Sequence, residues 1–295
     1  MTIKEFEEKA RTIHGHIGNN PEIIFHYRKL KRIENIIRKK ELRFGFFGYL
    51  ADEEEIKLGH QAILALIEKR HALINLDKKF ELAIRTGGSF KFSSSSIFPE
   101  FWTDFYRDFE NILKRMSIYI LSLADEKDDI ELHKEHAGAG LGASLGFRFI
   151  EDKNSDNRSD KRNPIYRVKI FYEKNIEEFN RFINRFLDLA EECLYKTSSS
   201  QDYKELATHL ATNLIVYLPA LKKDDFDFEK EHRLVLPGLI DNDRRRYPNE
   251  IAEDELADLN EQKGYHFLYN FKAQELTEIV LGCLVDENSE KEIKK

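Results

Sequence analysis

The sequence predicts an α+β protein in which a mixed or antiparallel central sheet is flanked by helices. Two observations lead to this fold class. The chain has 295 residues and is 41% hydrophobic, which is enough to bury a sizeable core. Segments with the pattern of strands do not alternate strictly with segments that have the pattern of helices. This order disfavours a doubly wound parallel sheet and favours an α+β arrangement.

The elements of the N-terminal half follow from capping residues and hydrophobic periodicity. Thr2 and Glu5 fit a capping box, so the first helix starts there and runs to about Ile13. Extended segments are expected at residues 23–28 and 42–47, on either side of a helix at 30–40. A helix is predicted over 52–84, and Pro99 opens the next one, because a proline suits the first turn of a helix.

The C-terminal half is predicted to consist of strands separated by helices. Buried strands are predicted at residues 117–123 and 145–150, separated by an acidic helix at 125–136. The remaining strands are expected at residues 165–172, 226–236, 265–271 and 276–285, and two helices at 176–195 and 201–218. In the predicted strand 226–236, Glu229, Glu231 and Arg233 share one face, because side chains alternate with period two.

The domain organisation predicted from these elements is simple. Residues 1–22 form an N-terminal helix and loop, and residues 23–285 form a single α+β domain. The segment from about 59 to 115 reads as a helical insertion in this domain. Residues 286–295 form a charged tail.

Composition and motifs exclude several classes of protein. A formal charge of −7 disfavours strong general binding to nucleic acid, and no apolar stretch has the length of a membrane span. The two cysteines have no metal-ligand spacing, so a cytoplasmic location is expected. There is no phosphate-binding loop and no HExxH motif. His133 and His136 are expected on the solvated face of a surface helix, and no metal site is predicted.

Several short segments occur in an order that resembles one bacterial family. The segments are His26-Tyr27-Arg28, Ser122-Leu123-Ala124-Asp125, Leu145-Gly146-Phe147, Phe228-Glu229-Lys230-Glu231-His232-Arg233 and Glu278-Ile279-Val280-Leu281-Gly282. Together they resemble the family catalogued as domain of unknown function 2971, over roughly residues 23–285. That name carries no activity, so the chemistry has to come from the residues.

Four of these residues also occur in an order similar to that of ADP-ribosyltransferases. Arg28 ends the first strand, Ser122 lies at the end of a middle strand, and Glu229 and Glu231 lie on a late strand. The resemblance implies an enzyme that uses NAD to modify a protein or nucleic-acid target. It assigns Glu231 and Glu229 as catalytic, and Tyr27, Arg28, Ser122 and Arg233 as cofactor-binding.

These residue types suit that reaction. A carboxylate stabilises the positive charge that develops on the ribose when the nicotinamide bond breaks. A guanidinium binds a pyrophosphate through two parallel hydrogen bonds. Ser122 could orient the ribose, and Tyr27 could stack on the nicotinamide. Glu231→Gln is then expected to lower turnover by roughly two orders of magnitude while leaving folding nearly intact.

Other interpretations of the same residues stay open. The charged residues of the late strand could simply protect a sheet edge from aggregation. The chain could be a non-catalytic binding or regulatory module, such as a defence or stress protein. It could also be a metal-dependent nuclease in which Asp227, Glu229 and Glu231 hold a hard cation.

Overall fold

The computed structural model describes the chain in segments, which fall into two compact units. The described residues are 1–15, 23–46, 53–71, 99–149, 165–197, 199–239, 245–246 and 266–285. Unit 1 contains Met1–Ile17, Glu54–Met116 and Phe171–Lys223, and unit 2 contains Gly18–Glu53, Ser117–Ile170 and Asp224–Lys295. The protein is α+β, as predicted.

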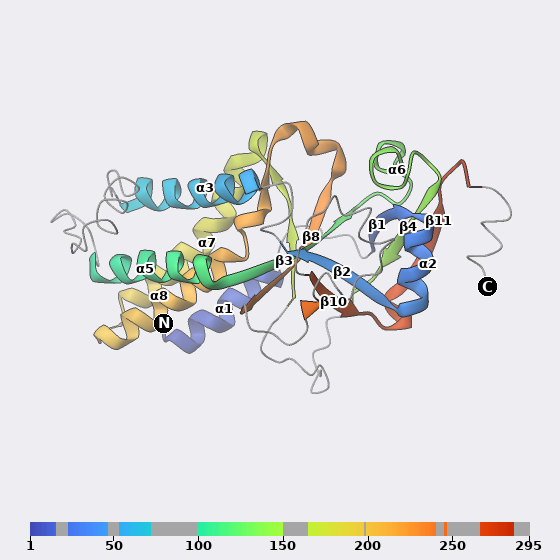
Figure 1. Cartoon of the computed structure of the whole chain (residues 1–295). Helices are drawn as coiled ribbons and strands as arrows, with labels where there is room; N and C mark the ends of the chain where they lie inside the picture. The colour runs from blue at the N-terminus through green and yellow to red at the C-terminus, as the bar shows by residue number, and fades with distance from the viewer. Residues whose placement is uncertain are drawn as a thin grey trace. The chain divides into compact units, whose positions relative to one another are not determined.

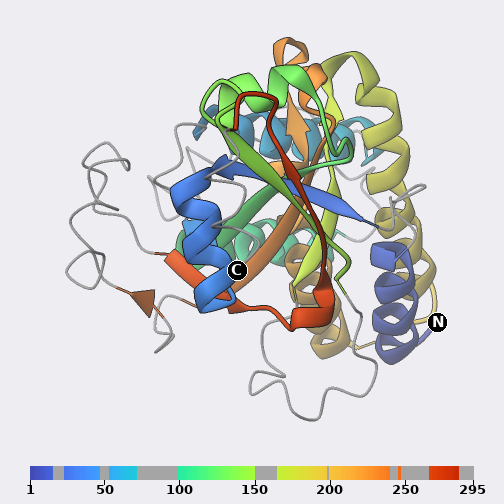
Figure 2. The same cartoon turned by 90° about the vertical axis from the view of Figure 1, so that its right-hand side faces the viewer.

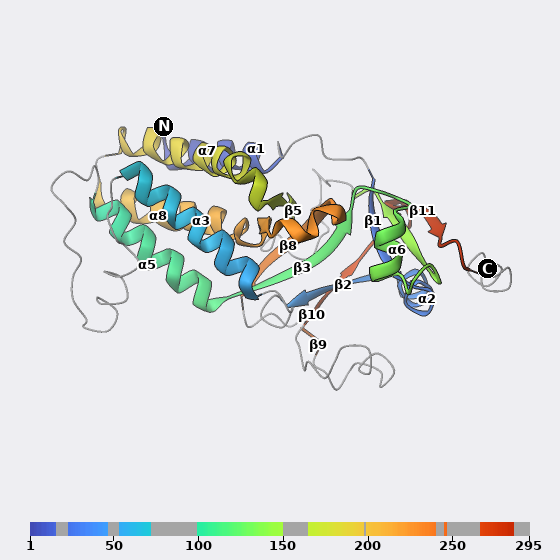
Figure 3. The same ribbon diagram turned by 90° about the horizontal axis from the view of Figure 1, so that it is seen from above.

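Unit 1 is mainly helical. Its helices lie side by side in Figures 1 and 3: α1 (Ile3–Gly15), α3 (Glu53–His71), α5 (Pro99–Arg115), α7 (Ile176–Leu194) and α8 (Ser200–Ile215). A parallel strand pair and two short 3₁₀ helices complete it: β6 (Phe171–Tyr172), β7 (Leu221–Lys222), η2 (Glu173–Asn175) and η3 (Leu218–Ala220). The predicted insertion at 59–115 falls in this unit, together with α1, α7 and α8.

Local signals in the sequence explain where unit 1 helices begin. The Thr2 N–H donates to Glu5 Oε2 at 2.7 Å, and the Glu5 N–H donates to Thr2 Oγ1 at 3.2 Å. These two bonds confirm the capping box. Ser199 caps α8 in a similar way, because its hydroxyl accepts from the Asp202 N–H at 3.1 Å. Among the described helices, none combines the length and apolar character that a bilayer crossing needs.

Unit 2 is built on a nine-stranded sheet in the described part of the chain. Its main path runs β11-β4-β1-β3-β2-β10-β9, and β8 pairs with both β3 and β5. The strands are β1 (Ile24–Lys29), β2 (Glu41–Phe46), β3 (Met116–Ala124), β4 (Gly142–Phe147), β5 (Tyr166–Lys169), β8 (Glu231–Leu239), β9 (Arg245–Arg246), β10 (His266–Asn270) and β11 (Leu276–Leu281). The pairs β1–β3, β1–β4, β2–β3, β2–β10, β4–β11, β5–β8 and β9–β10 are all antiparallel.

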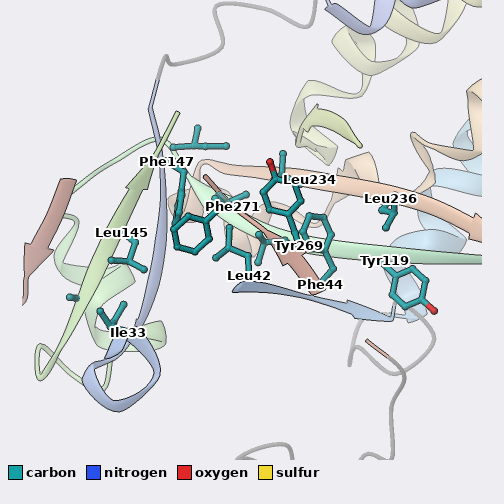
Figure 4. Packing of buried hydrophobic residues seen from close by; sticks show 14 residues of the cluster. Ile33, Leu42, Phe44, Tyr119, Leu145, Phe147, Leu234, Leu236, Tyr269 and Phe271 are labelled. Atoms are coloured by element: carbon teal, nitrogen blue, oxygen red, sulfur yellow. The ribbon is translucent and has the colours of Figure 1, made fainter. Parts of the chain in front are cut away.

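Two helices cover opposite faces of this sheet around β1 and β4. On one face lies the main apolar cluster (Figure 4), which takes Ile33 from α2 (Leu30–Lys39). On the other face, Phe25 and Tyr27 pack against Leu132 of α6 (Ile130–His136). Figures 1 and 2 show α2 and α6 on either side of these strands. Successive residues of β1 therefore point to opposite faces of the sheet.

The structure corrects several predicted boundaries. The strand predicted from Phe226 is wrong over residues 226–230, because residues 224–229 form a 3₁₀ helix, η4 (Asp224–Glu229), and β8 begins at Glu231. The strand predicted at 145–150 is β4, which begins three residues earlier at Gly142. The predicted strand 165–172 is divided between β5 and β6. A further short 3₁₀ helix, η7 (Ala273–Glu275), precedes β11.

Some predictions fall outside the described residues. These are the N-terminal loop at 16–22, the part of the predicted helix beyond His71, and the charged tail at 286–295.

Candidate functional site

The two carboxylates predicted to be catalytic have very different surroundings. Glu231 opens β8 and keeps 5% of its surface exposed, and Arg233 keeps 4%. Arg233 Nε donates to Glu231 Oε1 at 2.7 Å and an Arg233 terminal nitrogen donates to Glu231 Oε2 at 3.0 Å. As predicted, the two residues share a face of the strand. The ion pair is, however, buried, and each side chain satisfies the other.

Glu229 does not share that face, because it is not in the strand. It is the last residue of η4, and Lys230 follows it with a left-handed φ of 40°. Lys230 Nζ is bound to Glu126 at 2.8 Å. The Glu229 carboxylate instead lies 3.5 Å from Nε2 of His136, which is the last residue of α6. The Glu229 side chain is 13% exposed and the His136 side chain is 42% exposed.

Tyr27 is a structural residue in this fold. Its hydroxyl donates to the Glu126 carbonyl at 2.6 Å and accepts from the Asp129 N–H at 3.1 Å. Its ring is buried and meets His133 edge-on, with the ring centroids 4.9 Å apart. Burial raises the pKa of Tyr27 to about 12. The predicted stacking of Tyr27 on nicotinamide would therefore require α6 to move.

His133 also departs from its prediction. It was expected on a solvated helix face, but it is buried against Tyr27 and its Nε2 lies 3.3 Å from Asp128. His136 is the exposed histidine of this helix. Among the described residues, no group of three or more histidine, cysteine, aspartate or glutamate side chains is placed to hold a metal ion.

The two central strands β1 and β3 separate where Arg28 and Ser122 lie. Their register pairs Phe25 with Ala124. Beyond that pair, the contact is made by a side chain: His26 Nδ1 lies 3.1 Å from the Ser122 carbonyl oxygen, which places the proton on Nδ1. Ser122 is exposed. Burial, Arg28 and His136 lower the pKa of His26 well below its usual value, so the ring is neutral.

Arg28 is an exposed residue near two other arginines, Arg32 and Arg43. Desolvation by the surrounding chain, followed by repulsion from Arg32 and Arg43, lowers its pKa to about 10, which leaves it protonated at neutral pH. Its side chain nevertheless keeps exposed surface. No carboxylate of the described residues pairs with Arg28.

The start of α2 adds to this positive field. Lys29 is the N-cap residue and its side chain makes no capping hydrogen bond. The first turn of α2 contains no acidic residue. Unsatisfied N–H groups and the helix dipole make such an end attractive to anions. We refer to Arg28, Arg32 and Arg43 as the arginine cluster.

Gly142 brings the end of α6 to the end of β1. A Cβ at this position would lie 2.4 Å from the Arg28 carbonyl oxygen and 2.5 Å from the Ala137 carbonyl oxygen. Both distances are far below van der Waals contact, so this close approach of backbones requires glycine. Ala137 directly follows His136. The fold therefore brings the end of α6, with His136, to the end of β1 that holds Arg28. The Arg28 side chain is on the other face of the strand, because residues alternate and Tyr27 and Lys29 are on the α6 side.

The structure thus gathers some of the predicted residues and separates others. Arg28 and Ser122 lie near the point where β1 and β3 separate, and Glu229 lies beside His136 on the α6 side of β1. Glu231, Arg233 and Tyr27 are held in buried contacts. Sequence reasoning missed His26, Arg43 and His136 as members of the site. His26 directly precedes two predicted residues, which was the one signal that pointed to it.

Comparisons with known proteins identify no relative of this chain. No family model matches the chain, no curated protein matches it, and no solved structure matches it. The resemblance to domain of unknown function 2971 stays a prediction from the sequence.

Proposed function

We propose that the chain is an ADP-ribosyltransferase-like enzyme that uses NAD to modify a protein or nucleic-acid target. The observation that carries this proposal is Arg28, an exposed cation that no carboxylate of the described residues neutralises. The charges of Arg32 and Arg43 repel that of Arg28, and an anion bound at Arg28 would relieve this repulsion. A pyrophosphate supplies that charge and the geometry for parallel hydrogen bonds with a guanidinium.

Ser122 supports the proposal through its position. It is exposed on β3 beside the separation of the two strands, and His26 fixes its backbone at 3.1 Å. A hydroxyl held there can bond a sugar hydroxyl of a ligand whose phosphates lie on Arg28. The neutral His26 ring adds no further positive charge, so the cationic field stays concentrated on the arginine cluster.

Glu229 is a better candidate than Glu231 for the carboxylate that stabilises a positively charged ribose. Glu231 already has a bidentate partner and is buried. Glu229 lies beside a partly exposed histidine at the same end of β1 as Arg28. Its carboxylate is more exposed than that of Glu231, which would have to break its pair with Arg233 to act on a ligand.

Turnover of NAD tests the proposal. Nicotinamide release is measured for the wild type and for Glu229→Gln, with Glu126→Gln as the control because Glu126 is an exposed carboxylate close by. We expect Glu229→Gln to lower the rate by about 100-fold and the control to keep it. A wild type that binds NAD without releasing nicotinamide, alone or with protein and nucleic-acid acceptors, would replace the enzyme with a non-catalytic binding module.

A further inference from the structure

One short part of the chain is strongly basic although the chain as a whole is acidic. The formal charge of the protein is −7, but residues 28–43 contain eight lysines and arginines and only two acidic residues, Glu34 and Glu41. The cations are Arg28, Lys29, Lys31, Arg32, Arg38, Lys39, Lys40 and Arg43. Positive charge concentrated in this way is typical of a surface that binds a polyanion.

The fold turns part of this charge to one side of α2. The apolar side chains of the helix pack against the main apolar cluster of unit 2: Leu30, Ile33, Ile36 and Ile37. Lys31, Arg38 and Lys39 lie around the opposite side of the helix and are exposed. Lys40 directly follows the helix and is exposed too. We refer to Lys31, Arg38, Lys39 and Lys40 as the basic face. Lys29 is not part of it, because its side chain lies against Gly138 on the α6 side.

The spacing of these cations suits a long anion. Lys31 and Arg38 are about two turns apart on one side of the helix, or about 10 Å along its axis. A single phosphate group cannot contact both side chains over this distance, whereas a polymer of phosphates can. The basic face therefore fits a chain of phosphates better than one phosphate.

The other residues of α2 favour a nucleic-acid duplex among the polyanions. A helix that binds an anionic membrane combines cations with apolar side chains that enter the lipid, but none of the large exposed hydrophobic residues in the described part of the chain lies on α2. A single strand is held by bases that stack on aromatic side chains, and α2 contains no aromatic residue. Contacts to phosphates are what such a surface can make, and a duplex presents its phosphates on the outside.

We propose that the basic face of α2 binds the phosphate backbone of a double-stranded nucleic acid. The contacts read no base sequence, because lysine and arginine side chains on phosphates contain no sequence information. The negative charge of the whole chain keeps the binding moderate and sensitive to salt. Only Lys29 separates Arg28 from the start of α2, so a duplex bound there lies beside the place where we expect NAD. Of the two target classes of the proposed enzyme this favours nucleic acid, and that choice rests on the proposed function.

Duplex binding in the absence of NAD tests the surface. Fluorescent DNA and RNA duplexes of about two helical turns are titrated with the protein at about 50 to 200 mM salt, and binding is followed by fluorescence anisotropy. We expect unrelated sequences to bind equally and the affinity to fall as salt rises. Lys31→Gln combined with Arg38→Gln should weaken binding about 10-fold at the lowest salt and make the logarithmic salt slope shallower by about two.

The matched control removes the same amount of charge elsewhere in unit 2. It combines Lys127→Gln with Lys134→Gln, because both lysines are exposed near α6. This control should bind the duplexes as the wild type does. A wild type that does not bind at the lowest salt, or a Lys31–Arg38 double variant that binds no more weakly than the control, would show that the charges only solvate α2. Binding to phosphatidylserine vesicles or to single strands in preference to duplexes would also overturn the proposal.

The target class has a separate test, which keeps the two proposals apart. Transfer of labelled ADP-ribose from NAD to the duplex is measured for the wild type and for the Lys31–Arg38 double variant. We expect the wild type to label the duplex, and the double variant to lose this labelling while it still releases nicotinamide to water. A wild type that binds the duplex and does not cleave NAD would remove the proposed function and leave the surface. A wild type that cleaves NAD and labels protein acceptors but not the bound duplex would refute the nucleic-acid target.

Discussion

Glu229 and Glu231 are only two residues apart and their environments assign them different roles. The turn at Lys230, with its left-handed φ of 40°, separates the end of η4 from the first residue of β8. Glu231 enters the sheet and pairs with Arg233, whereas Glu229 stays beside the exposed His136. In the segment 229–231, Glu231 is therefore a structural carboxylate and Glu229 is the candidate catalytic one.

The buried ion pair leads to a prediction about stability. Glu231→Gln leaves the Arg233 guanidinium buried without its countercharge, so it should lower the free energy of unfolding by about 3 kcal/mol. Urea denaturation measures this loss. Glu231→Leu combined with Arg233→Met removes both charges and should recover most of it. A Glu231→Gln variant as stable as the wild type would show that the pair contributes little.

At the scale of single elements, the arginine of α3 holds two helices of unit 1 together. Arg70 Nε donates to Glu191 at 2.7 Å, and its terminal nitrogens donate to Asn184 at 2.8 Å and to Asp188 at 2.5 Å. All three acceptors lie on α7. These hydrogen bonds with Glu191 and Asp188 raise the pKa of Arg70. The planar fork of a guanidinium is what allows one side chain to reach three acceptors.

Replacing Arg70 by a lysine tests this role, because lysine keeps the positive charge but lacks the planar guanidinium group. Arg70→Lys keeps a cation but cannot bind three acceptors in one plane, so we expect a loss of about 1–2 kcal/mol in unfolding free energy. Arg185→Lys is the control, because Arg185 is exposed on α7. Thermal denaturation of both variants gives the comparison. Equal midpoints for Arg70→Lys and Arg185→Lys would contradict the role of the fork.

The sequence predicted most elements because their signals are local. The capping box of Thr2 and Glu5 and the apolar run of β3 both lie within a few residues. The failure at η4 has a local cause too. Phe226 and Phe228 alternate with acidic residues and imitate a strand, but an Asp227 carbonyl to Lys230 N–H bond of 3.3 Å closes a 3₁₀ turn.

The site could be predicted only in part because its contacts are long-range. His26 contacts Ser122 from 96 positions away, and His136 contacts Glu229 across unrelated segments. Order along the chain pointed to Arg28 and Ser122. It carried no information on which carboxylate would be buried, since Glu229 and Glu231 differ only after the turn between them is formed.

At the scale of the whole molecule, each unit contains a histidine whose pKa is lowered by desolvation, the half-buried His14 and the buried His26. In unit 1, His14 bonds the Tyr217 hydroxyl and lies 2.6 Å from Asn213 Oδ1. Burial lowers the pKa of His14, and burial together with Arg28 and His136 lowers that of His26. Both rings therefore bind a proton more readily in the unfolded chain than in the folded one.

This difference predicts that stability falls as the solution becomes acidic. Below the unfolded pKa of about 6.5 the unfolded chain takes up protons that the folded histidines do not. Each histidine then lowers the unfolding free energy by up to about 1.4 kcal/mol per pH unit. Unfolding measured between pH 7.5 and 5.5 should show this decline, and His14→Gln should make it shallower. An unfolding free energy that is constant over this range would contradict the lowered pKa values of the two histidines.

The central claim of this account is that Arg28 binds the pyrophosphate of NAD, and calorimetric titration tests it most directly. The wild type, Arg28→Gln and Arg38→Gln are titrated with NAD; Arg38 is the control because it is exposed at the far end of α2. A charge-assisted hydrogen bond contributes about 1.5–3 kcal/mol, so Arg28→Gln should weaken binding about 10- to 100-fold, with Arg38→Gln unchanged. A wild type that does not bind NAD, or an Arg28→Gln variant that binds it as tightly as the wild type, would contradict the claim.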